Sequence, residues 1–455
     1  MKKKNTLYWK MHVTNMMKKG RFLLLLTFVS IGRLWAQQDS LTVEEAVAYA
    51  LRNNYNIMLA RQDSAVAAIN YDYRNAAFLP RLNATGQALF SNNNQKQTLA
   101  DGSERKRSGI RSTNLSSAVN LSWTVFDGFR MFLLREGIDV AVNQGNLVIK
   151  STVVNTVASV INTYYDIVRQ KQQLRNVEEQ LQLSSDRLRL AQYKFEIGAG
   201  IKPDVLQSQI DFNNSTAARL NQLALIDQRK QTLNQLMNVA PATDYKVSDT
   251  IRVETVLVLG NLLSILSQAS PELQLARTNI ELAALNVRLA KAARYPTVSL
   301  ISAYNFNRSS SNQVINQFSP LFNLNHGWNY GISATIPILN NFTVKQQIRQ
   351  AQLAVDFQEL QYRNQEQLLN TALLNTYRNY DAQKQVVATL DTSVGLAREN
   401  LYIERERYRL GRTTFIELRQ AEENVSTILT NLINARYNLK VAETELRRLR
   451  GELVR

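Results

Sequence analysis

Few residues of this chain are of a type that could do catalytic or metal chemistry. Its 455 residues include no cysteine and two histidines, His12 and His326. A thiolate nucleophile is therefore excluded, and a histidine-based catalytic or zinc site is disfavoured. The acidic residues are scattered over predicted helices and form no paired constellation of the kind that carboxylate-only catalysis needs. The sequence thus predicts a protein that is not an enzyme and that carries no cofactor and no metal ion.

Two carboxylates stand out by their position. Asp204 and Glu417 each follow a glycine, Gly198 and Gly411, by six residues, and each lies in the first turn of a predicted helix. A negative charge is favoured there by the partial positive charge of the helix N-terminus. Helix capping is therefore one interpretation of both acids, and it is compatible with a further role.

The elements that position these acids come from a tandem repeat. Leu59-Ala60-Arg61 recurs 216 positions later as Leu275-Ala276-Arg277, and the tip glycines and their neighbours recur at an offset of 213. We interpret residues 37–240 as repeat 1 and residues 262–455 as repeat 2. A linker of the equatorial region, 241–261, joins them.

Proline placement predicts two very long helices, since proline is disfavoured inside a helix. Residues 129–197 and 343–410 contain no proline and carry apolar seams of heptad spacing, as in coiled coils. At about 1.5 Å per residue, each would span roughly 100 Å. Helices over 203–238 and 414–450 would complete two antiparallel hairpins.

Strand pairs are predicted between the helices, over about 81–90 and 113–126 and over about 297–307 and 328–339. Each alternates apolar residues with Asn, Ser, Thr or Gly and carries aromatic residues near its ends, as transmembrane β-strands do. A sheet packed on a soluble core is the alternative, but its water-facing side would carry more Lys and Glu. Polar loops are expected over 91–112 and 307–327.

The N-terminus predicts export. Lys18, Lys19 and Arg21 precede the apolar run 22–31, and Ala36 offers a cleavage site, so residues 1–36 resemble a secretory signal peptide. The formal net charge of +17 would fall to +9 on cleavage, since eight basic residues and no acids would be lost. We interpret the remaining excess as solvated helix faces, and an exported chain has no nucleic-acid partner. Without cysteine, a lipid anchor on that residue is excluded.

Four strands per chain cannot close a barrel in lipid, where backbone groups at an open edge would stay unpaired. Several copies must therefore contribute to one barrel. Two copies would give eight strands with a filled interior, and three would give twelve strands with an open lumen.

The hairpin tips resemble those of the TolC family of outer-membrane efflux proteins. Phe195-Glu196-Ile197-Gly198 followed by Pro203-Asp204-Val205-Leu206 is similar to the family's tip, and Tyr408-Arg409-Leu410-Gly411 followed by Phe415-Ile416-Glu417-Leu418 is its second copy. Phe126-Asp127-Gly128 resembles the family's strand-to-helix junction. The resemblance covers nearly the whole mature chain.

This resemblance implies a mainly α-helical fold with a β-barrel part. A homotrimer would form a 12-stranded barrel in the outer-membrane lipid of a Gram-negative bacterium, continued by a 12-helix periplasmic tunnel. The chain would be the passive exit duct of a tripartite efflux or secretion system. An inner-membrane transporter would deliver the substrate through a periplasmic adaptor protein.

The resemblance also implies functional residues at the tips. A periplasmic gate is expected at Asp204, Tyr408, Arg412, Glu417 and Gln420, and adaptor docking at Gly198, Gly200 and Gly411. A threefold ring of carboxylates would favour cations. Gln420 stands where relatives can carry a second acid, and Thr413 stands where they can carry an arginine, for which Arg412 is the candidate substitute.

A secreted or surface structural coiled-coil protein is the alternative function. It would share the signal peptide and the heptads but would need neither membrane-length strands nor duplicated glycine tips. The cargo stays open, because the lumen-facing Asn, Ser and Thr residues are generic.

Overall fold

The computed structural model describes residues 40–253, 266, 269–316 and 318–453. The predicted signal peptide and part of the predicted linker lie outside these residues. The described chain forms two compact units. Unit 1 contains 40–54, 156–253 and 376–446, and the rest belongs to unit 2. Each unit takes segments from both sequence repeats, so the repeats are not themselves the compact units.

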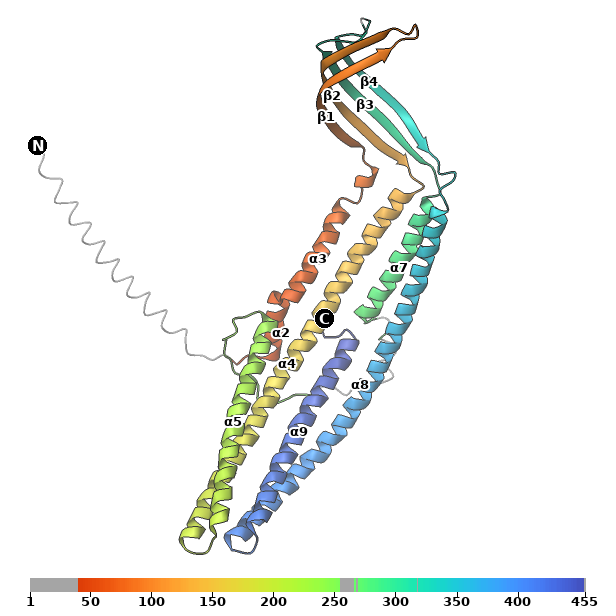
Figure 1. Cartoon of the computed structure of the whole chain (residues 1–455). Coiled ribbons are helices and arrows are strands. Elements are labelled where there is room, and N and C mark those ends of the chain that lie inside the picture. The colour runs from red at the N-terminus through yellow and green to blue at the C-terminus, as the bar shows by residue number, and fades with distance from the viewer. Residues whose placement is uncertain (1–39, 254–265, 267–268, 317, 454–455) are drawn as a thin grey trace, which may run out of the picture. The chain divides into compact units, whose positions relative to one another are not determined.

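Unit 2 contains one antiparallel sheet of four strands in the order β1-β2-β3-β4 (Figure 1). The strands are β1 (Arg81–Thr98), β2 (Glu104–Phe126), β3 (Thr297–Ser311) and β4 (Phe322–Thr335). Repeat 1 supplies the first two and repeat 2 the others. Both β1 and β4 are edge strands in this chain.

One face of the sheet is apolar and exposed, because successive side chains of a strand point to opposite faces. The strand register places the following exposed side chains on this apolar face: Leu82, Phe90, Leu115, Val119, Trp123, Val125, Tyr304, Phe322, Leu324, Trp328, Tyr330 and Ile332. Trp328 and Tyr330 are 66% and 84% exposed. Such a face is stable only against an apolar partner or lipid.

The strands differ from the predicted ranges at their loop ends. Residues 91–112 were expected to be a polar loop, but β1 and β2 continue through most of them and leave a turn over 99–103. Likewise β3 and β4 extend into 307–327, while β4 ends at Thr335, before Pro337. The prediction of loops from polar residues was wrong here, because main-chain hydrogen bonding between strands continues where the side chains are no longer apolar.

The sheet passes into the long helices through left-handed residues. Gly128 and Phe129 have φ of 69° and 68°, and their repeat counterparts Asn341 and Phe342 have φ of 50° and 62°. At Gly128 an added Cβ would lie 2.6 Å from the carbonyl oxygen of Ala292, so the chain needs glycine there. The predicted sharp turn at Asp127-Gly128 is therefore present.

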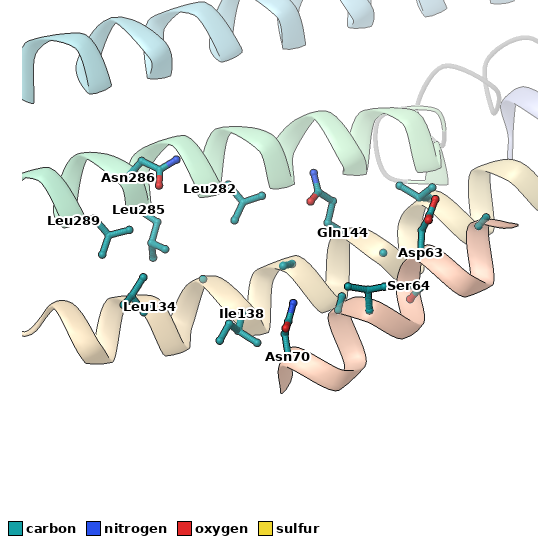
Figure 2. Close-up of a pocket in the computed structure, with 17 residues that line it drawn as sticks. Asp63, Ser64, Asn70, Leu134, Ile138, Gln144, Leu282, Leu285, Asn286 and Leu289 are labelled. Carbon is teal, nitrogen blue, oxygen red and sulfur yellow. The ribbon is translucent and has the colours of Figure 1, made fainter. Parts of the chain in front are cut away.

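The helices of unit 2 are α3 (Tyr55–Asp72), α7 (Pro271–Ala292) and the first parts of α4 (Arg130–Glu196) and α8 (Thr343–Arg409). A groove of about 600 Å³ lies among α3, α4 and α7 (Figure 2). Its lining combines leucine and isoleucine with the uncharged polar residues Ser64, Asn70, Gln144 and Asn286, and Asp63 is the one acid among the lining residues. Asp63 is also the one ionisable residue of the lining, so the lining offers no pair of acid and base side chains.

Unit 1 contains α2 (Val43–Asn53), α5 (Lys202–Met237), α9 (Phe415–Leu449) and the remainders of α4 and α8. Its hydrophobic core joins α2, α4 and α5 to the segment after α5. The Tyr164 hydroxyl donates to the Leu41 carbonyl at 2.8 Å and accepts from the Ser248 amide at 3.1 Å. Through these bonds, Tyr164 holds the segment before α2 and the segment after α5 against α4.

Among the helices of the described residues, none combines the length and apolar character needed to span a bilayer.

Candidate functional site

The tips of the two hairpins are closed by glycines in the left-handed conformation. Gly198, after α4, has φ of 74°, and Gly411, after α8, has φ of 71°. The Ala199 amide donates to the Lys194 carbonyl at 2.8 Å, and the Arg412 amide donates to the Arg407 carbonyl at 2.8 Å. Both tips thus have the bonding of a Schellman cap, which requires a residue without a Cβ penalty.

A pocket of about 400 Å³ lies between the two tips in unit 1, and we call it the tip pocket. Four of the predicted functional residues line it: Gly200, Asp204, Tyr408 and Gly411. Gly198, Arg412, Glu417 and Gln420 are not among its lining residues. The structure therefore brings only part of the predicted set together.

Tyr408, which lines the tip pocket, connects the two hairpins. Tyr408 is 5% exposed, although it is the last residue but one of α8. The Lys194 ammonium lies 3.8 Å from the centroid of the Tyr408 ring and donates to the Tyr408 carbonyl at 2.9 Å. Lys194 thereby connects the first hairpin to the second through a cation–π contact and a hydrogen bond.

Asp204 faces the same pocket from the first turn of α5. The N-cap of α5 is Ile201, which provides no side-chain capping bond, and the Asp204 side chain forms no hydrogen bond with the described residues. Burial raises the pKa of Tyr408, and the negative charge of Asp204 raises it further, while Arg187 opposes both. The Asp204 carboxylate is therefore close enough to act on Tyr408 electrostatically.

Glu417 has a different environment from its repeat counterpart. Its carboxylate accepts hydrogen bonds from the Thr413 hydroxyl at 2.5 Å and from the Thr414 amide at 2.7 Å. The Glu417 amide donates back to the Thr414 hydroxyl at 3.3 Å, which completes a capping box. These bonds lower the pKa of Glu417 to about 2, the Thr413 hydroxyl having the largest effect. Its observed contacts are those of a helix cap.

Arg412 and Gln420 make only local contacts. The Arg412 carbonyl accepts a bond of 3.5 Å from Arg407, and its guanidinium forms no ion pair with the described residues. The Gln420 amide donates to Asn424 at 3.2 Å on the surface of α9. Neither side chain reaches Asp204.

A buried ionic cluster that the sequence did not reveal lies beyond the tip pocket. Arg187 of α4 donates to Asp211 of α5 at 2.7 Å and to Glu422 of α9. The side chains of Arg187 and Glu422 are 5% and 7% exposed. We call Arg187, Asp211 and Glu422 the hairpin joint, because they connect the first hairpin to the second.

The hairpin joint has one cation for two carboxylates. Burial raises the pKa of Glu422 to about 7, and the lowering effects of Arg187 and Arg405 do not cancel it. The Arg187 guanidinium also lies 5.3 Å from the centroid of the Phe415 ring. Charged residues within a coiled-coil pattern usually indicate solvated faces, so only the structure reveals that Arg187 and Glu422 are buried and that Asp211 is half-buried.

Long duplicated hairpins and a strand pair from each repeat define the class of tunnel-forming outer-membrane channels. The sequence profile described as outer membrane efflux protein matches residues 46–240 and 262–452. This chain belongs to the outer membrane efflux protein family.

Relatives agree with this assignment. The chain is 22% identical over 415 residues to the probable efflux pump outer membrane protein TtgC of Pseudomonas putida, covering 90% of this chain and 82% of the relative. The antibiotic efflux pump outer membrane protein ArpC of Pseudomonas putida matches with the same identity and coverage.

Solved structures show the same fold. The CmeC outer membrane channel of Campylobacter jejuni has a TM-score of 0.77 at 14% identity, covering 92% of this chain and 88% of that one. VceC of Vibrio cholerae has a TM-score of 0.73 at 16% identity, covering 90% and 96%.

These comparisons confirm the predicted TolC-like fold with its tandem repeats, and the alternative of a surface coiled-coil protein finds no support. The chain is an outer-membrane efflux channel protein of a Gram-negative bacterium, with its helical part in the periplasm.

Proposed function

We propose that three copies of this chain assemble into one passive exit duct, and that the duct performs no chemistry itself. The observation that carries this proposal is the four-stranded sheet, whose edge strands β1 and β4 have no partner within the described chain and whose apolar face is exposed. Unpaired backbone groups at such edges are not tolerated in lipid. Three copies give twelve strands and an open lumen, whereas two give eight strands and a filled interior.

The partners follow from the same role. TtgC and ArpC are named as efflux pump components, so we infer an inner-membrane transporter that supplies the energy and a periplasmic adaptor between the two proteins. The capped tips at Gly198 and Gly411, together with Gly200, form the proposed adaptor contact. Their rigid, exposed turns suit docking to another helical hairpin.

Native mass spectrometry of the mature protein extracted from outer membranes in detergent tests the assembly. We expect the mass of three mature chains, each slightly below the 51.8 kDa of the full sequence. A mass of one or two chains, or recovery without detergent, would contradict the proposal.

We infer that the tip pocket is the gate at the periplasmic end. Asp204 has no capping bond to occupy it, and Tyr408 and Lys194 hold the two hairpins together beside it. Three copies of Asp204 would present a carboxylate ring that attracts cations and narrows the passage. Glu417, in contrast, is engaged in its capping box, so we assign it a structural role.

Planar-bilayer recordings distinguish these two acids. Asp204→Ala combined with Tyr408→Leu is expected to raise single-channel conductance, because the ring charge and the contact of Lys194 with the Tyr408 aromatic ring are lost. Glu417→Gln is the matched control and should leave the conductance near the wild-type value. Unchanged conductance in the double variant, or an equal rise in the control, would remove the gating role from Asp204.

A further inference from the structure

The turn-side end of the sheet is strongly basic. Of the residues in the strands and their turns, the basic ones at this end are Lys96, Arg105, Lys106, Arg107, Arg111 and Arg308. The acidic ones are Asp101 and Glu104, and residues 297–335 contain no acid. A charge excess of this kind on an exposed surface attracts anions from outside the chain.

The two acids are already engaged. Asp101 accepts hydrogen bonds from the Ser103 amide at 2.9 Å and the Ser103 hydroxyl at 2.6 Å within the β1–β2 turn. Glu104 pairs with Lys96 at 2.7 Å. Within the described residues, the other five cations form no ion pair. The basic end is therefore not neutralised by its own chain.

Two of the arginines lie on the apolar face of the sheet. Arg308 of β3 pairs directly with Leu115 of β2, and side chains paired in this way point to the same side. Arg111 precedes Leu115 by four residues, which is again the same side. The Arg308 guanidinium lies 5.5 Å from the centroid of the Phe322 ring, which is itself 53% exposed. The apolar face thus ends in arginine.

The height of Arg308 matches the boundary of the hydrocarbon layer, and Arg111 lies four residues further toward the turns. From Thr297 to Arg308 the strand advances eleven residues, which at about 3.3 Å per residue and a tilt near 45° rises roughly 25 Å. An apolar band of a membrane barrel has about this height. Because the helices leave the opposite end of the sheet toward the periplasm, this boundary is the outer one.

We propose that Arg111 and Arg308 bind the phosphate groups of an anionic lipid in the outer leaflet of the outer membrane. The planar guanidinium presents paired donors that match phosphate oxygens. Exposed Leu324, which pairs with Arg308, would contact the acyl chains, and exposed Phe90 and Phe322 lie on the same face between the levels of the two arginines. A soluble phosphate would satisfy the cations but would leave this apolar surface uncovered, which is why the lipid is favoured.

The pairing of two lysines supports an external anion. Lys96 and Lys106 are direct partners across β1 and β2, and like charges in this position destabilise a strand pair. Glu104 offsets the charge of Lys96. A phosphate at this end would offset that of Lys106, so these lysines extend the proposed site.

The test uses the assembled full-length channel, purified in detergent and stripped of lipid. Native mass spectrometry would count bound molecules as the protein is titrated with bis-phosphorylated lipid A and with its dephosphorylated form. Arg111→Gln with Arg308→Gln should weaken binding of the phosphorylated lipid by at least about tenfold, since two cationic contacts are lost. Binding of the dephosphorylated form should not change.

The matched control is Arg81→Gln with Arg294→Gln, which removes two exposed arginines near the helix-side end of the sheet and should change affinity by less than about twofold. Arg111→Lys with Arg308→Lys keeps the charge and covers the case in which the glutamine variant fails to assemble. This variant should bind better than the glutamine variant and less tightly than the wild type. Wild-type affinity in the glutamine variant, or equal loss in the control, would overturn the proposal. If inorganic phosphate at equal concentration displaced lipid A, the claim that the bound phosphate belongs to a lipid would be wrong.

Discussion

Arg187 lies between two carboxylates that belong to different hairpins, and this arrangement makes the hairpin joint sensitive to protonation. Asp211 and Glu422 share the one guanidinium, and Glu422 is the more buried of the two acids. Desolvation disfavours its charged form more than the nearby arginines favour it. When Glu422 is protonated near neutral pH, Asp211 is therefore the remaining negatively charged partner of Arg187 in the hairpin joint.

Glu422 should make the protein less stable as the pH rises toward 7. Its folded-state pKa of about 7 lies above the ordinary value of 4.5, so between these values the folded state holds a proton that the unfolded state has released. Stability is then highest at the acidic end of this window and falls as pH rises through it, by about 3 kcal/mol at most. Thermal unfolding of Glu422→Gln, followed by circular dichroism between pH 5 and 8, should show a flatter pH dependence than the wild type.

The neighbouring Glu423 provides the control for this prediction. It is 55% exposed at its side chain and pairs with Arg419 on the surface of α9. Glu423→Gln should keep the wild-type pH dependence. If both variants behave alike, the buried position of Glu422 does not set the pH response.

At the scale of elements, Gly395 inside α8 and Gly411 after its end have opposite effects on stability. Gly411 has φ of 71° and nothing within 4 Å of an added Cβ. Gly411→Ala should therefore lower the free energy of unfolding only through the strain of a left-handed alanine, by about 1 kcal/mol. Gly395 lies inside α8 with equally open space and helical backbone, so Gly395→Ala should stabilise the protein by up to about 1 kcal/mol. Thermal melting of the two variants in parallel should shift in opposite directions, and a shift in the same direction would contradict the cap at Gly411.

Most of the elements could be predicted from the sequence because their signals are local. Proline-free heptads indicated α4 and α8, and the observed helices, Arg130–Glu196 and Thr343–Arg409, lie within the expected ranges. The strand ends could not be placed, since Asn92, Asn93 and Asn94 have the composition of a loop while β1 continues through them. Inter-strand hydrogen bonding is a long-range property that composition does not report.

At the scale of the whole molecule, the candidate site was predictable only where the repeat marks it. The offset of 213 paired Asp204 with Glu417, but the two acids have different contacts. Thr413 and Thr414 donate hydrogen bonds to Glu417. At the corresponding end of α5, Ile201 and Pro203 offer no such donors to Asp204. Lys194 and the hairpin joint were missed because their partners lie more than twenty residues away or on the other hairpin. Such contacts depend on how the helices pack.

The unpaired edges of β1 and β4 also bear on inheritance. In a barrel completed by several copies, each strand edge must be covered by the neighbouring copy, so a defective copy affects the whole barrel. When a cell makes intact and defective chains in equal amounts, most barrels will contain at least one defective copy. Loss-of-function variants that still assemble should therefore behave as dominant alleles, unlike those of a protein that works alone.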